Sequence, residues 1–174
     1  FARFVDAKTL EVNGETITGE VVQKSGPNGF APATHLTESL ANIGFSIRRF
    51  KTGTPARVDG RTIDYSKCEI QEGDKDIYPF SFMHDTPPEN KLPCYLTYTN
   101  LKTHEIITDN LDRSPLYDGT ILSTGPRYCP SIEDKVVKFA DKERHQIFIE
   151  PEGLNTNEMY VGGMSSSLPG LPFP

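Results

Sequence analysis

Glycine and proline interrupt this chain so often that its helices and strands must be short. The sequence contains 14 glycines and 14 prolines among 174 residues. Proline lacks a backbone N–H and glycine adopts positive φ, so both end regular structure. The stretch Lys51–Asp76, for example, is broken by Gly53, Pro55, Gly60 and Gly73, and we predict a surface loop there. The length suits one compact domain, or two small lobes.

Hydrophobic periodicity predicts an α+β or irregular α/β fold, a mixed sheet with short flanking helices, because strands and helices alternate without a βαβ rhythm. The dipeptide Asn13-Gly14 favours a hairpin turn. The predicted strands are two within Ala2–Thr18, then Phe45–Phe50, Leu92–Thr99 and His145–Glu150. The predicted helices are Thr34–Ile43, which stops at Gly44, then Leu101–Leu111 and Ser131–Ala140.

The charge and cysteine content exclude several classes of protein. A net charge of -6 and a pI of about 5.2 argue against an autonomous nucleic-acid-binding domain. Any polyanion would have to bind at a local cluster of basic residues. No apolar run approaches the roughly 18 residues of a membrane span. The cysteines Cys68, Cys94 and Cys129 are far apart in the sequence, which disfavours disulfide bonds and favours a reduced intracellular protein. The histidines do not have metal-ligand spacing with these cysteines, which disfavours a metal site.

The segment GPRYCPSIEDKVVKF, Gly125 to Phe139, places a lone cysteine before a predicted helix start. Pro130 suits a helix entrance, and Ser131 followed by Asp134 forms a pattern similar to a capping box. Cys129 would then lie near unpaired amide hydrogens and near Arg127, a setting that lowers the pKa of a thiol. The alternative is that Cys129 is a small apolar space-filler.

A second cluster of charge lies in RRFKTGTPARVDGR, where the five basic residues Arg48, Arg49, Lys51, Arg57 and Arg61 face only Asp59, a local charge of +4. The cluster predicts either an anion or RNA contact, or a solvated, ion-paired strand and loop. No GxxxxGK[ST] or GxGxxG pattern is present to cradle a phosphate.

Seven motifs occur in one order along the chain: RRFKTGTPARVDGRTIDYS, PFSFM, LPCYLTYTNLKTHEII, NLDRSPLYDG, GPRYCPSIEDKVVKFADK, HQIFIEPEGLNTNEMYVGG and SSLP. Together, from Ile17 to Pro169, they resemble the MnmG (GidA) family. The resemblance implies part of a FAD- and NAD(P)-binding flavoprotein. Such enzymes work with the GTPase MnmE to add a carboxymethylaminomethyl or aminomethyl group to carbon 5 of the wobble uridine in tRNA. They use FAD, NAD(H) and methylene-tetrahydrofolate.

The resemblance also assigns roles to residues. It implies that Cys129 is catalytic, because a thiolate can add to carbon 6 of a uracil and activate carbon 5. It implies RNA contacts by Arg48, Arg49, Lys51 and Arg57. It implies cofactor contacts by Ser25 and by Gly125, Pro126, Arg127, Tyr128, Cys129, Pro130, Ser131, Ile132, Glu133, Asp134, Lys135, Val136, Val137, Lys138 and Phe139. A cytoplasmic homodimer is expected for the complete enzyme.

Residues 1–18 resemble the β-rich segment of glutathione reductase instead, so we predict three parts: 1–18, the MnmG-like 19–169, and a tail 170–174. The family's Gly-rich flavin loop and its helical C-terminal region are absent, so we expect the piece to be inactive alone and to hold FAD weakly. Two alternatives are a non-catalytic RNA- or partner-binding module and a fragment of a disulfide reductase, although the latter's CxxxxC is missing.

Overall fold

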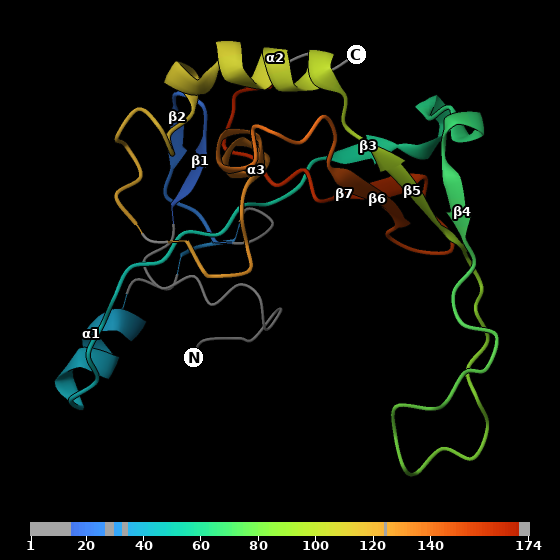
Figure 1. Ribbon diagram of the computed structural model, residues 1–174. Helices are drawn as coiled ribbons and strands as arrows, with labels where there is room; N and C mark the ends of the chain where they lie inside the picture. The colour runs from blue at the N-terminus through green and yellow to red at the C-terminus, as the bar shows by residue number, and fades with distance from the viewer. Residues whose placement is uncertain (1–14, 27–29, 33–34, 124, 171–174) are drawn as a thin grey trace. The chain divides into compact units, whose positions relative to one another are not determined.

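The computed structural model describes residues 15–26, 30–32, 35–123 and 125–170, which form two compact units. Unit 1 draws on residues 1–52, 109–129 and 167–174, and unit 2 on residues 53–108 and 130–166. Each unit is therefore built from segments that are distant in the sequence (Figure 1). None of the helices in the described part of the chain is long and apolar enough to span a membrane.

Unit 2 is built on a five-stranded sheet in the order β3-β7-β6-β5-β4. The strands are β3 (Arg57–Asp59), β4 (Glu69–Gln71), β5 (Cys94–Tyr98), β6 (Gln146–Pro151) and β7 (Glu158–Gly162). The α+β class is confirmed, but every pairing in this sheet is antiparallel rather than mixed. A parallel pair needs a long crossover connection, whereas β6 and β7 are joined by a short turn.

The helices of unit 2 lie where the periodicity predicts them. They are α2 (Leu101–Asp109), which begins in this unit, and α3 (Ile132–Lys138), with the short 3-10 turns η2 (Gly60–Thr62) and η3 (Tyr65–Lys67). The buried apolar residues of the unit are Leu96, Ile107, Ile132, Val136, Ile147, Ile149 and Met159. In β6 the buried Ile147 and Ile149 alternate with the exposed Gln146 and Phe148, so one face of this strand is packed more tightly than the other.

Unit 1 contains a hairpin of β1 (Thr16–Thr18) and β2 (Val21–Gln23). Its turn requires a glycine, because Gly19 has a φ of 53° and an added Cβ would lie 2.7 Å from the Cβ of Pro169. The turn predicted at Asn13-Gly14 and the strand before it lie outside the described residues, whereas the strand predicted to end at Thr18 is β1, which pairs with β2. The origin of residues 1–18 stays a prediction.

The remaining elements of unit 1 are α1 (Leu36–Asn42) and the 3-10 turn η4 (Leu111–Arg113). The helix α1 ends as predicted before Gly44, which has a φ of 95°.

Two predictions about strands are wrong. Phe45–Phe50 alternates like a strand, yet it forms no ladder among the described residues and its large apolar side chains are exposed. The predicted loop Lys51–Asp76 contains the edge strands β3 and β4. Strand β7 was not predicted. The three-residue strands β3 and β4 have too little local signal to be recognised, because they exist only through pairing with their neighbours.

Candidate functional site

The thiol of Cys129 is half-buried and lies in unit 1. The backbone N–H of Cys129 donates a hydrogen bond of 3.2 Å to the carbonyl of Pro126, which closes a turn. In the same turn, the guanidinium of Arg127 lies 5.1 Å from the centre of the Tyr128 ring, and both side chains are exposed. Cys129 is therefore not enclosed in a hydrophobic core, and it stays the candidate nucleophile.

The helix start after Cys129 is fixed by the predicted capping box. The amide of Asp134 donates to Ser131 Oγ at 3.1 Å, and the amide of Ser131 donates to Asp134 Oδ2 at 3.4 Å. Ser131 is the N-cap, so Pro130 precedes the cap rather than opening the helix as we predicted. The reason is that the capping box needs a hydroxyl at the N-cap, and only Ser131 supplies one three residues before Asp134.

The side chains of α3 divide between packing and exposure. Ile132, Glu133 and Val136 are buried, and Glu133 Oε1 accepts a hydrogen bond of 3.1 Å from Ser166 Oγ. Lys135 Nζ donates to the carbonyl of Gly163 at 3.0 Å, which fixes the helix to the end of β7. Much of the predicted cofactor segment therefore packs within unit 2 and stabilises it.

The predicted cofactor segment is divided between the two units. Residues 125–129 belong to unit 1 and residues 130–139 to unit 2. Within unit 1, Lys51 Cε lies 2.8 Å from the position that a Cβ on Gly125 would occupy. The fold thus brings the end of the basic cluster to the beginning of GPRYC, a contact that the sequence did not indicate.

The predicted RNA-contacting residues are also divided. Arg48 and Arg49 are exposed and lie with Lys51 in unit 1, whereas Arg57 lies in unit 2. Arg57 Nε donates to Glu152 Oε1 at 2.9 Å, and its guanidinium lies 4.8 Å from the centre of the Tyr160 ring. Arg57 is therefore exposed but already paired with Glu152 of its own unit, and the cluster does not form one continuous patch inside a single unit.

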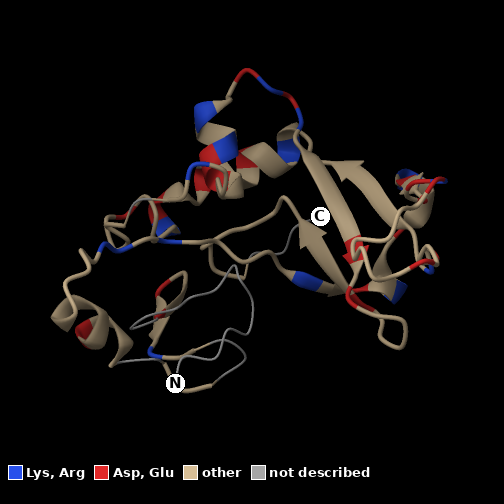
Figure 2. Cartoon of the chain, turned by 90° about the horizontal axis from the view of Figure 1, so that it is seen from below, with Lys and Arg blue, Asp and Glu red and all other residues tan. Residues whose placement is uncertain are grey.

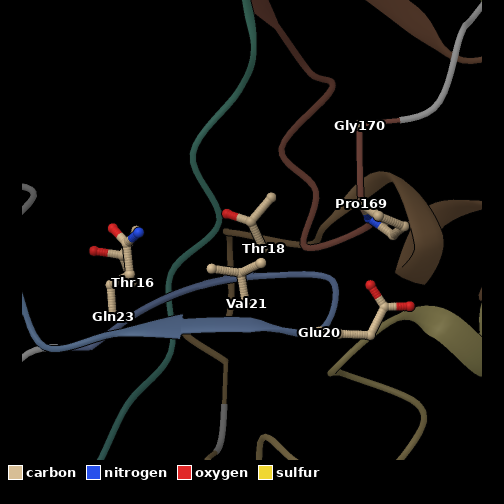
Figure 3. Close-up of a pocket in the computed structure, with 7 residues that line it drawn as sticks. All are labelled: Thr16, Thr18, Glu20, Val21, Gln23, Pro169 and Gly170. Atoms are coloured by element: carbon tan, nitrogen blue, oxygen red, sulfur yellow. The ribbon is translucent and has the colours of Figure 1, made fainter.

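Ser25, the residue predicted to contact the flavin, lies beside a pocket in unit 1. Its Oγ lies 2.5 Å from Thr16 Oγ1, and Thr16 lines a cavity of about 370 Å³ together with Thr18, Gln23 and Gly170 (Figure 3). The pocket offers hydroxyl, amide and carboxylate groups beside the apolar side chains of Val21 and Pro169. The volume lies near the lower end of the range for ligand pockets, so it fits only a part of FAD.

Two histidines of unit 2, His104 and His145, lie together in a hydrogen-bond network that the sequence did not predict. Thr99 Oγ1 lies 2.8 Å from His104 Nε2 and accepts a hydrogen bond of 2.8 Å from the backbone N–H of His145. The two rings lie 5.2 Å apart. Burial lowers the pKa of both His104 and His145, with the neighbouring cations adding to the effect at His145. Neutral rings that pack together indicate a structural role.

The other cysteines are weaker candidates for a nucleophile. Burial raises the pKa of Cys94, and the nearby charge of Glu150 raises it further, which favours the unreactive thiol form. Cys68 is half-buried and its Sγ lies 3.9 Å from the carbonyl of Asp64. In the described ranges, no group of three or more His, Cys, Asp or Glu residues could hold a metal ion.

The antiparallel α+β unit and the capped helix after a half-buried thiol are found in a known class of protein. A solved structure described as Aquifex aeolicus GidA in its form I crystal superposes with a TM-score of 0.78 at 48% identity, covering 91% of this chain and 28% of that chain. The family model described as "Glucose inhibited division protein A" matches residues 11–170. The chain belongs to this family.

Curated relatives share most of the chain. "tRNA uridine 5-carboxymethylaminomethyl modification enzyme MnmG" of Lachnoclostridium phytofermentans is 61% identical over 160 residues, covering 91% of this chain and 26% of the relative. The protein of the same name from Caldicellulosiruptor saccharolyticus is 61% identical over 158 residues, covering 91% and 25%. The chain thus spans about a quarter of the length of the curated relatives it matches.

Proposed function

We propose that this chain is part of a FAD-dependent enzyme that modifies carbon 5 of the wobble uridine in tRNA, acting with the GTPase MnmE in the cytoplasm. The product is the carboxymethylaminomethyl or aminomethyl uridine. The observation that carries the proposal is the 61% identity, over 91% of the chain, with a protein whose name states this modification. Identity at that level across both units supports a shared reaction.

In this proposal Cys129 is the nucleophile. Its thiolate bonds to carbon 6 of the uracil, and the electron pair of the C5=C6 bond moves to carbon 5 and the O4 oxygen. Carbon 5 would then bond to the methylene carbon of the one-carbon donor as the bond from that carbon to one of the donor's nitrogens breaks, with the electron pair left on that nitrogen. Loss of the proton from carbon 5 and breakage of the bond from carbon 6 to sulfur restore the ring and release the thiolate. The half-buried turn that holds Cys129 suits this chemistry, since a reactive thiol must be reachable.

The cofactors of the complete enzyme would contact two parts of the sequence. Ser25 would contribute a hydroxyl to FAD, and the segment Gly125–Phe139 would contact NAD(H). When bound, the flavin and the nicotinamide supply the redox chemistry and methylene-tetrahydrofolate supplies the carbon. The residues that would hold the tRNA backbone are Arg48, Arg49, Lys51 and Arg57. Lys51 lies beside Gly125 at the beginning of the cysteine segment. We propose a homodimer for the complete enzyme.

The test is the replacement Cys129→Ser in the full-length protein. We expect loss of wobble-uridine modification, measured by mass spectrometry of digested tRNA, with circular dichroism and FAD content unchanged. Cys68→Ser is the matched control, because Cys68 is also half-buried and has no assigned role. Full turnover by the Cys129→Ser variant would assign the thiol to packing and remove the nucleophilic mechanism.

A further inference from the structure

A basic pocket in unit 2 has no role in the mechanism above. It has a cavity volume of about 540 Å³ and lies between α3, the turn that follows it and strand β6. Its walls carry Lys135, Lys142 and Arg144, and the rings of Phe139 and Phe148. We call these five residues the basic pocket. All of them lie within one unit, so the pocket is a feature of that unit alone.

The charge of the basic pocket is opposite to that of the chain. The protein has a net charge of -6, yet none of the described residues that line the pocket is acidic. Asp141 and Glu143 alternate with Lys142 and Arg144 in the adjoining turn (Figure 2). The contact from Asp141 to Lys142 is 3.8 Å long and exposed, and such a pair has little strength in water. Lys142 is therefore available to an anionic ligand.

Two phenylalanine rings are open to water at the same place. Phe139 is 50% exposed and Phe148 is 39% exposed. Phe148 lies opposite Gly162 in the register of β6 and β7, and opposite the buried Leu96 of β5. Gly162 has no side chain to cover the ring, although Glu150 Oε2 lies 2.9 Å from the position that a Cβ on Gly162 would occupy. Exposed aromatic rings beside cations are the usual means of holding single-stranded nucleic acid, through stacking and phosphate contacts.

The cations are held in place before any ligand binds. Lys135 Nζ is fixed by its hydrogen bond of 3.0 Å to the Gly163 carbonyl. The guanidinium of Arg144 lies 4.2 Å from the centre of the Tyr98 ring on the neighbouring strand β5. Tyr98 is 37% exposed and continues the aromatic surface beyond the pocket. A surface that extends over two strands suits a continuing chain of nucleotides.

We propose that the basic pocket binds a nucleotide of single-stranded RNA, with the base stacked on Phe148 and the phosphates against Lys142 and Arg144. We take this RNA to be the anticodon loop of the substrate tRNA, and only that identification rests on the proposed function. Lys142, Arg144 and Phe148 lie outside the segment Gly125–Phe139, so they can be changed without altering the residues assigned to NAD(H).

The experiment measures binding of a labelled, unmodified anticodon stem-loop to the full-length protein by fluorescence anisotropy at several salt concentrations. The double variant K142A/R144A should bind at least about tenfold more weakly at low salt. The slope of log K against log salt should become shallower by about 1.4, because each phosphate that a cation neutralises on a single strand contributes roughly 0.7. The matched control K75A/K102A removes two exposed lysines of unit 2 that do not line the pocket, and should have no effect.

The variant Phe148→Leu tests stacking without a change of charge. It should weaken binding by about tenfold at every salt concentration and leave the salt slope unchanged. Equal affinities for K142A/R144A and K75A/K102A would overturn the proposal. So would a loss of NADH affinity in K142A/R144A with RNA affinity unchanged, because the ligand would then be the dinucleotide.

The two proposals fail separately. Cys129→Ser should leave RNA affinity and its salt slope unchanged. If Cys129→Ser retains turnover while K142A/R144A loses RNA, the nucleophilic mechanism is wrong and the basic pocket stands. If Cys129→Ser loses turnover while K142A/R144A binds RNA normally, the pocket is wrong and the mechanism stands.

Discussion

Replacing Ser131 with alanine should loosen α3, the helix that follows Cys129, carries Lys135 of the basic pocket and is followed directly by Phe139. Ser131 Oγ accepts the hydrogen bond from the Asp134 amide at 3.1 Å and donates to Asp134 Oδ2 at 3.2 Å. The residue is only 1% exposed, so water cannot easily take the place of the missing hydroxyl. The alanine variant leaves the Asp134 amide without its partner at the helix start.

The loss of stability should lie at the upper end of the range for N-caps. Removing an N-cap hydroxyl costs about 0.5 to 2 kcal/mol, and burial at Ser131 places the expected loss near 2 kcal/mol. Since each 1.36 kcal/mol corresponds to a factor of ten, the amides of α3 should exchange with solvent about 30-fold faster.

Native-state hydrogen exchange of the full-length protein, read by mass spectrometry on peptides that cover α3, measures this directly. The matched control is Ser39→Ala in α1, where an exposed Ser39 Oγ donates to the His35 carbonyl at 3.0 Å. That bond competes with the helix rather than capping it, so exchange in α1 should change little.

A double-mutant cycle with Asp134→Ala separates the capping box from other effects. Asp134 also forms a 2.9 Å ion pair with Lys138. Asp134→Ala removes this ion pair whether residue 131 is serine or alanine, so its loss cancels in the cycle. We expect the double variant to lose less stability than the sum of the two single losses, because the two side chains share one interaction. Strictly additive losses, or unchanged exchange in Ser131→Ala, would refute the reasoning.

Two further predictions concern a surface ion pair and a glycine. The hydrogen bonds from Arg61 hold the pKa of Asp59 at about 2, well below 3.8. This stabilising effect is present above pH 3.8 and is lost as the pH falls towards 2. Arg61→Ala should raise the pKa of Asp59, measured by NMR, part of the way towards 3.8, because the side-chain hydrogen bonds are lost while the backbone N–H of residue 61 still donates to Asp59 Oδ1. Gly163 has a φ of 96°, and an added Cβ would lie 2.8 Å from the Gln146 carbonyl oxygen. Gly163→Ala should therefore lower the thermal unfolding temperature more than the control Gly73→Ala, because Gly73 has a similar φ of 86° but its new Cβ meets only the movable side-chain amide of Asn90. Equal shifts in the two variants would contradict this prediction.

The longer elements could be predicted because their signals are local. The helix start at Ser131 follows from a hydroxyl and a carboxylate three residues apart, and β5 and β6 follow from alternation of apolar and polar residues. The edge strands β3 and β4 could not be predicted, because three residues form a strand only when a partner is present. Phe45–Phe50 shows the converse, since its alternation has no partner strand in the described part of the chain.

The sequence by itself determined the family, the candidate nucleophile Cys129 and the capped helix after it, since each depends on the order of neighbouring residues. The tertiary structure alone decided which distant residues meet. It divides the basic cluster between two units, places Lys51 beside Gly125, and sets Phe148 opposite Gly162 so that the ring stays open beside Lys142 and Arg144. Such contacts depend on strand register and on packing between segments that are far apart in the chain, and no local pattern carries that information.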